Sequence, residues 1–472
     1  MKKYIILFLL LLSLLTTFIL LKNKYAKYNL FFILKQNPKI EDIIIDSMSA
    51  FSEENNNDRI IYSSTLNTIH PVEISIFGHK REIKLSSLNK KSFIRIHLII
   101  YENKQLKHKI YRLYLLPKKF PEFRATNPEN IDKGFIFTSF HIRDKYELRD
   151  SSVAIIDTTG RLVYYRLNQN IGGSLLNLRK WNVGGNNILY SFHENLGFPR
   201  DYFEESFSIF EGRVVIMDSG FNIVDAVTIL PTNRHPAMKA EEHENIVIDK
   251  GHYIVFGYYE PENSPIEHLA IIQEIKNKEV IFDWFASDYE ELYIDEPARK
   301  DGIEPFLKIN SISIDPKDNN LVVSFKILKR IVKINRKTGR ILWQLGGVRD
   351  DFNLPKELAF TLQHHAQFVG DELVIYDNVP RYAPFANSRI IKLQLDEKNH
   401  KILHSKTIPL IDRYETLGSI QILDNDNMII GCGGSTYGCI AQLVTPDSKV
   451  LWGLSNNSQY NSFRSYYYKK ID

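Results

Sequence analysis

Imidazole, ammonium and amide side chains recur along the second half of this 472-residue chain. His243 is followed by Lys308 and Asn310, and then by His364 and His365, each at the start of a short apolar stretch. An imidazole exchanges protons near neutral pH, whereas ammonium and amide N–H groups donate hydrogen bonds to anionic oxygens. If the fold brings the starts of these stretches together, the side chains form one site.

The elements that must position these residues form an internal repeat. A polar or glycine turn leads into a β-branched run whose first apolar residue stands at 162, 223, 280, 341, 402 and 450. Alternating strands such as Ile309 to Ile314 and Leu321 to Phe325 lie in phase with these runs. Four short strands about every 60 residues, repeated six times, predict an all-β fold with a six-bladed β-propeller. A series of β-sandwiches is the alternative interpretation.

In a propeller, the innermost strand of each blade lines a central channel, so the first residues of several inner strands can converge. The residues at this position are His243, Lys308 with Asn310, His364 with His365, and Gly418 with Ser419. We interpret this convergence as a candidate active site. A polar, solvated channel without catalysis is the alternative.

Residues 36–128 do not share the repeat. Val72 to Ile76, Phe93 to Tyr101 and Lys109 to Leu116 alternate as strands, and Lys39 to Ser52 has the pattern of a short amphipathic helix. We therefore expect a small N-terminal β-rich domain over 36–128, followed by the propeller over 134–472, with the first blade starting near Gly134.

The N-terminus carries a targeting or membrane signal. Lys2 and Lys3 precede 18 residues without charge, Tyr4 to Leu21, which is long enough to span a bilayer. We expect residues 1–22 to form a signal-anchor (a single transmembrane helix) or a signal peptide. The protein is then exported and membrane-anchored, facing the periplasm or the cell exterior, or it is periplasmic if the segment is cleaved.

Charge and motif content exclude several functions. The chain has 60 Lys and Arg against 56 Asp and Glu, which leaves no electrostatic footprint for nucleic acid. No phosphate-binding or dinucleotide-binding glycine motif and no His-Glu-x-x-His sequence occurs, so we expect no cofactor and no metal. A metal site from His243, His364 and His365 has no support in their spacing. Cys432 and Cys439 flank a predicted hairpin loop, where they form either a disulfide or two free buried thiols.

Several segments resemble the bacterial arylsulfotransferase family. The most specific are Ile341-Leu342-Trp343-Gln344-Leu345-Gly346-Gly347 and Gln363-His364-His365-Ala366. Asn310-Ser311-Ile312, Ser388-Arg389 and Leu417-Gly418-Ser419-Ile420-Gln421 extend the resemblance, which covers about residues 110–455. It implies an exported six-bladed propeller that moves a sulfuryl group from a phenolic sulfate ester to a phenol, independently of adenosine-phosphosulfate donors.

The resemblance also implies roles for individual residues. His364 stands where the family has a histidine that becomes transiently sulfated, while His243 and Asn310 match a further histidine and an asparagine. At two positions this chain differs, because Lys308 stands in place of a family histidine and Lys326 in place of an arginine.

The chemistry of sulfuryl transfer predicts a role for each of these residues. Ammonium groups disfavour a nearby imidazolium, so Lys308 and Lys326 should keep His364 neutral and nucleophilic while they bind sulfate oxygens. Asn310 would donate to the same oxygens, and His243 would act as general acid and base.

Arg389 is a further candidate for sulfate binding, with a structural ion pair as its alternative. Two alternative functions also stay open. One is a non-catalytic ligand-binding propeller, and the other is a hydrolase that passes the sulfuryl group to water.

Overall fold

The computed structural model describes residues 121–142, 151–167, 173–184, 187–195, 211–259, 269–292, 307–378, 387–434, 438–456 and 460–471, and individual strands between residues 26 and 115. The chain divides into two compact units, Met1–Phe120 and Pro121–Asp472. The apolar segment Tyr4 to Leu21 lies outside the described residues. No helix within the described part of the chain is long and apolar enough to cross a membrane.

The first unit contains two sheets. A four-stranded sheet has the order β2-β6-β7-β3, and a three-stranded sheet has the order β1-β4-β5. The strands are β1 (Ala26–Asn29), β2 (Lys39–Asp46), β3 (Arg59–Ser63), β4 (Val72–Ile76), β5 (His79–Ile83), β6 (Ile94–Glu102) and β7 (Gln105–Leu115). The helix predicted over Lys39 to Ser52 is therefore wrong. The β-branched run Ile43-Ile44-Ile45 favours a strand, and β2 gains its hydrogen bonds by pairing with β6.

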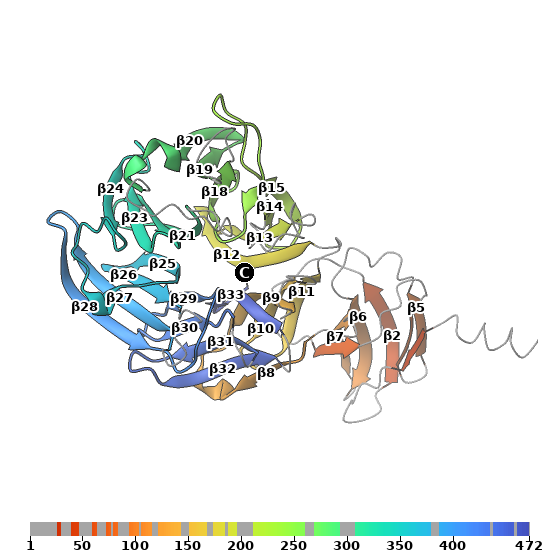
Figure 1. Ribbon diagram of the computed structural model, residues 1–472. Coiled ribbons are helices and arrows are strands. Elements are labelled where there is room, and N and C mark those ends of the chain that lie inside the picture. The colour runs from red at the N-terminus through yellow and green to blue at the C-terminus, as the bar shows by residue number, and fades with distance from the viewer. Residues whose placement is uncertain are drawn as a thin grey trace, which may run out of the picture. The chain divides into compact units, whose positions relative to one another are not determined.

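The second unit is a propeller of six antiparallel sheets arranged around a central axis (Figure 1). The predicted all-β six-bladed architecture is confirmed. From the axis outward, the blades are as follows. Blade 1 is β33 (Tyr460–Tyr468), β9 (Phe135–Ile142), β10 (Ser152–Asp157) and β11 (Leu162–Leu167); blade 2 is β12 (Ser174–Val183), β13 (Asn187–Asn195), β14 (Glu211–Met217) and β15 (Ile223–Val227), with β16 (Ala240–Glu241) paired to β14; blade 3 is β17 (Ile246–Asp249), β18 (His252–Tyr259), β19 (Leu269–Lys276) and β20 (Glu279–Phe285).

The remaining three blades continue the ring in chain order. Blade 4 is β21 (Ile309–Ile314), β22 (Leu321–Phe325), β23 (Arg330–Ile334) and β24 (Ile341–Leu345); blade 5 is β25 (Gln363–Val369), β26 (Glu372–Asp377), β27 (Arg389–Asp396) and β28 (Lys401–Pro409); blade 6 is β29 (Ser419–Ile422), β30 (Met428–Gly431), β31 (Cys439–Val444) and β32 (Val450–Asn456), with β8 (Phe123–Thr126) outside. Short 3-10 turns occupy η2 (Pro128–Asn130), η4 (Ala286–Asp288), η5 (Glu290–Leu292) and η6 (Lys356–Leu358). Five of the six repeat positions read from the sequence fall in the outermost strand of a blade, and the sixth, Val450, begins β32, which β8 covers on its outer side.

Blade 1 closes the ring by joining the two ends of the propeller sequence. Its inner strand β33 comes from the C-terminus and pairs antiparallel with β9, so that Tyr466 lies opposite Phe137. The C-terminus consequently lies in the middle of the ring (Figure 1). Because β33 lines the axis, its side chains face the inner strands of the other blades.

The aromatic residues that end several repeats connect neighbouring blades. The indole N–H groups of Trp284, Trp343 and Trp452, which lie on the fourth strand of their blades, donate hydrogen bonds to the next blade around the ring. Trp284 donates to the carbonyl of Gly339 at 3.0 Å, Trp343 to a carboxylate oxygen of Glu397 at 2.8 Å, and Trp452 to the carbonyl of Thr158 at 2.9 Å. Burying a tryptophan with its N–H satisfied fixes the spacing of the blades.

Candidate active site

Local bulges turn polar side chains toward the axis on three inner strands. The pairing with the second strand of the blade shifts between Leu176 and Arg179 on β12, between Ile309 and Ser311 on β21, and between Gln363 and His365 on β25. A bulge adds an unpaired residue and redirects its side chain. The additional residues include Asn177, Asn310 and His364, and all three are buried.

His364 is held in one orientation by its own strand. Its Nδ1 lies 3.0 Å from the carbonyl oxygen of Leu362. A carbonyl only accepts, so Nδ1 carries the proton and Nε2 keeps its lone pair. Burial, followed by the charges of Lys326, His243 and Lys308, sets the pKa of His364 well below its ordinary value. The ring is therefore a neutral base with a free nucleophilic nitrogen, and the lysine effect has the sign expected from the sequence.

The two lysines share one corner of blade 4. Lys308 precedes β21 and Lys326 follows β22, and the Lys326 N–H donates to the Lys308 carbonyl at 2.9 Å. The Lys308 side chain is buried. Both ammonium groups act on His364 through their charge, so this corner supplies positive potential where the oxygens of an anionic substrate would lie.

His243 lies close to His364. The two ring centroids are 6.5 Å apart with an interplanar angle of 29°, and the ring of Phe463 on β33 lies 5.5 Å from His243. The backbone of His243 is anchored by Asn177, whose Nδ2 donates to its carbonyl at 3.1 Å. His243 is 5% exposed, so it is not a surface histidine although acidic residues flank it in the sequence.

Two acidic residues beside His243 were not recognised in the sequence. Glu241 Oε1 lies 2.6 Å from His243 Nδ1, and Glu242 Oε1 lies 4.0 Å from the same nitrogen. Burial raises the pKa of Glu241 to about 7 and that of Glu242 well above its ordinary value. The three side chains could offer ligand atoms to a metal ion. The ammonium of Lys308, however, already acts on both carboxyl groups and provides the positive charge that a cation would bring.

The buried Arg464 at the axis was also not indicated by the sequence. Arg464 Nη1 on β33 donates to Glu244 Oε2 at 2.6 Å, and Nη2 donates to the carbonyls of Asn310 at 2.5 Å and His364 at 3.1 Å. Arg179 from blade 2 donates to the other oxygen of Glu244 at 2.5 Å. One guanidinium therefore ties the backbone of the site residues in blades 4 and 5 to the centre.

Asn310 and Arg389 take part in the framework of the site. The Asn310 amide donates to the carbonyl of Gln363 at 3.0 Å, which joins blades 4 and 5. Arg389 pairs with Asp377 at 3.1 Å and donates to the carbonyls of Glu357 and Ala359. Arg389 therefore makes the structural ion pair that was the alternative to sulfate binding in the sequence analysis.

Asp377 links that arrangement to the candidate nucleophile. Its Oδ1 accepts from the backbone N–H groups of Thr361 and Leu362, at 3.0 and 3.2 Å. Arg389 therefore supports the segment whose carbonyl, at Leu362, orients His364.

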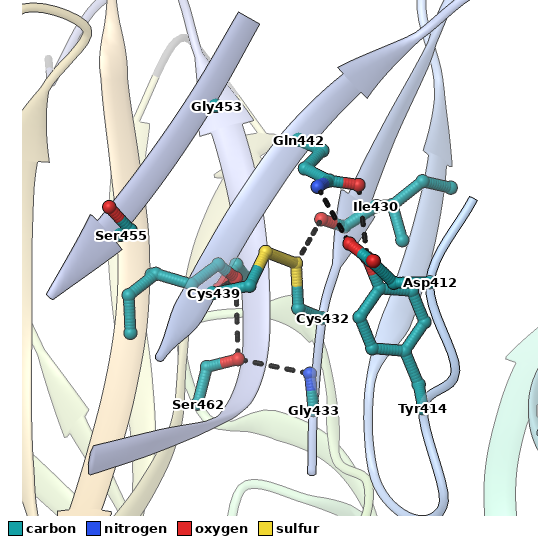
Figure 2. Close-up of a disulfide and its surroundings, with 12 residues drawn as sticks. Asp412, Tyr414, Ile430, Cys432, Gly433, Cys439, Gln442, Gly453, Ser455 and Ser462 are labelled. Atoms are coloured by element: carbon teal, nitrogen blue, oxygen red, sulfur yellow. Dashed lines mark hydrogen bonds between the residues drawn. A yellow bond between two sulfur atoms is a disulfide. The ribbon is translucent and has the colours of Figure 1, made fainter. Parts of the chain in front are cut away.

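Cys432 and Cys439 form a disulfide in blade 6 (Figure 2). The bridge joins the residue after β30 to the first residue of β31, with the Cα atoms 5.7 Å apart. Ser462 on β33 lies below it, where its hydroxyl accepts from the Gly433 N–H at 3.1 Å and donates to the Ile440 carbonyl at 3.2 Å (Figure 2). The bridge and these bonds fix the start of the closing strand against blade 6.

Comparisons with known proteins give a family for the region that carries the site. Residues 243–453, which comprise blades 3 to 6 almost completely, match the family model described as arylsulfotransferase (ASST). No curated protein matches the sequence. Among solved structures, a Bacteroides caccae protein of unknown function is 12% identical with a TM-score of 0.42, covering 72% of this chain and 100% of its own. A Pseudomonas aeruginosa periplasmic gluconolactonase is 8% identical with a TM-score of 0.38, covering 71% of this chain and 99% of its own.

Proposed function

We propose that this protein transfers a sulfuryl group from a phenolic sulfate ester to a phenol through a sulfated His364, because residues 243–453 match the arylsulfotransferase family model. The observation that carries the proposal is the state of that histidine. Its Nδ1–H is bound by the Leu362 carbonyl, and burial and the two lysines disfavour its protonation, so that Nε2 is the available nucleophile.

The first half of the reaction uses groups already in place. The Nε2 lone pair attacks sulfur, the bond between sulfur and the aryl oxygen breaks, and the leaving phenolate takes a proton from His243. The charges of Lys308 and Lys326 stabilise the sulfuryl oxygens, as positive groups do in the related transfer of phosphoryl groups. Sulfation makes the His364 ring cationic, and the Leu362 carbonyl stabilises its Nδ1–H.

The second half regenerates the protein. His243 takes the proton of the acceptor phenol, the phenol oxygen attacks sulfur, and the bond to Nε2 breaks and returns its electron pair to the ring. Splitting one transfer into two steps predicts ping-pong kinetics.

The test is the mass of the full-length protein after incubation with a chromogenic aryl sulfate in the absence of an acceptor. We expect an increase by one sulfuryl group on the peptide containing His364, which a phenol then removes. His364→Ala should abolish the adduct. His365→Gln is the matched control, because His365 Nδ1 accepts from the Ile420 N–H of blade 6 instead, and this variant should still form it. Release of phenol without a sulfated acceptor would identify a hydrolase, and saturable binding without release would identify a binding protein.

We further propose that the protein is exported. The disulfide supports this location, because such bonds persist in oxidising compartments. The uncharged segment Tyr4 to Leu21 would direct export as an anchor or a cleaved signal. Fractionation of cells that produce the full chain, with N-terminal sequencing of the product, tests both points, and a cytoplasmic product with free thiols would contradict them.

A further inference from the structure

Glu241 and His243 form a closely hydrogen-bonded, buried pair. One carboxyl oxygen, Oε1, is 2.6 Å from the ring nitrogen Nδ1, and the other, Oε2, accepts the backbone N–H of His243 at 2.6 Å. Glu241 itself is fixed by β16, which pairs with β14 of blade 2. A carboxylate that binds one nitrogen of an imidazole sets the tautomer of the ring and stabilises its protonated form.

We propose that Glu241 is a positioning residue that holds His243 as the proton donor to the departing phenolate. This inference rests on the proposed sulfuryl transfer. With its Nδ1–H directed to Glu241, His243 exchanges protons with the substrates only through Nε2. A carboxylate at Nδ1 compensates the positive charge that the ring carries before it donates.

The charged groups around Glu241 come from four parts of the propeller. Glu242 and His243 adjoin it in the sequence, His193 approaches from β13, Lys308 from the start of β21, and Arg464 from β33. Burial raises the pKa of Glu241 to about 7, while the His243 N–H and then the charges of Lys308, His193 and Arg464 oppose that rise. Ionised Glu241 is consequently lost as the pH falls through neutrality, and proton donation by His243 should weaken with it.

Glu242 provides a matched control in the neighbouring position. It is as buried as Glu241, but its nearer oxygen is 4.0 Å from His243 Nδ1, and its Oε2 has no hydrogen-bond partner among the described residues. Burial and the charge of Glu241 raise its pKa well above the ordinary value, which favours its neutral form. Glu242→Gln resembles that neutral form in shape, whereas Glu241→Gln removes the carboxylate that is hydrogen-bonded to His243.

The experiment compares full-length variants on aryl sulfates whose phenols differ in acidity. A nitrophenol departs without help, whereas an unsubstituted phenol needs a proton. General acid catalysis contributes about 10²-fold to 10⁴-fold. We therefore expect Glu241→Gln to lower the rate of His364 sulfation about 10-fold to 100-fold with phenyl sulfate, but less than about 3-fold with nitrophenyl sulfate. The acid limb of the phenyl sulfate profile near pH 7 should disappear, and Glu242→Gln should keep the dependence on the leaving group seen in the wild type.

Equal losses on all donors would overturn the proposal, because a merely structural residue does not distinguish leaving groups. Thermal melting shows which variants fold. If Glu241→Gln does not fold, Glu241→Asp replaces it in the experiment. Its carboxylate lies one methylene further from Nδ1, so the rate of His364 sulfation should depend somewhat more steeply on the acidity of the leaving phenol than in the wild type. An unchanged dependence would refute the proposal. In a His243→Gln background, the Glu241 substitution should add no further change. Absence of a His364 adduct in the wild type would instead refute the proposed function itself.

Discussion

Arg464 should be the most important ionic side chain for the stability of the propeller. Only 2% of its side chain is exposed, and its guanidinium joins Glu244 of blade 3 to the backbones of Asn310 and His364. Arg464→Met keeps an unbranched side chain but removes the charge and all four hydrogen bonds that Arg464 donates. Breaking a buried pair costs about 3–5 kcal/mol because the remaining charge is left uncompensated.

The structure refines this estimate. Glu244 retains Arg179, whose side chain is 18% exposed, so its charge stays partly balanced. Two carbonyl oxygens lose a donor, however, and each loss of a bond to a charged group costs about 1.5 kcal/mol or more. The two effects oppose each other, and we expect a net loss of about 3–4 kcal/mol in the free energy of unfolding.

Urea denaturation of the full-length protein measures this loss. All four tryptophans lie in the second unit, so their fluorescence reports on the propeller. Arg124→Met is the control, because Arg124 and Glu122 are 73% and 69% exposed and such pairs contribute little. The double variant Arg464→Met with Glu244→Gln should lose less than the sum of the single variants. A loss below about 1 kcal/mol for Arg464→Met would refute the view that a charged centre holds the blades together.

Three further predictions concern the site and its framework. Lys326→Met should raise the pKa of His364, because the ammonium lowers it, so with nitrophenyl sulfate, which needs no proton donor, the acid limb set by His364 should move to higher pH and the KM for the donor should increase; an unmoved limb would show that the Lys326 charge does not act on this pKa. Arg389→Met should lower the melting temperature and kcat but leave the KM for the donor unchanged, since its contacts are with Asp377 and backbone carbonyls; a selective rise in KM would instead indicate a sulfate contact. Replacing both Cys432 and Cys439 by Ala should cost about 2 kcal/mol in the free energy of unfolding, as expected for a loop closed over seven residues, and a denaturation midpoint equal to that of the wild type would contradict this.

Local patterns were sufficient to predict the repeat and several of the residues that the folded ring brings close together. The apolar runs beginning near 162, 223, 280, 341, 402 and 450 recur once in each blade after a polar or glycine turn, and this signal lies within a few residues. The inner-strand starts follow from the same register, which is why His243, Lys308 and His364 could be named together. The error at Lys39 arose where a short segment satisfied both the helical and the strand pattern, and pairing with β6 decided it.

Only the tertiary structure decided which charged residues surround the site and how β33 closes the ring. Arg464 lies 100 residues or more from Glu244, Asn310 and His364, and no spacing rule connects β33 to the inner strands of the other blades. Glu241 and Glu242 look like solvated acids in the sequence, because burial is a property of the assembled ring. The sequence by itself determined which strands exist and which residues begin them. The closure of the ring determined which of those residues share a proton or a charge, since both depend on distances between blades.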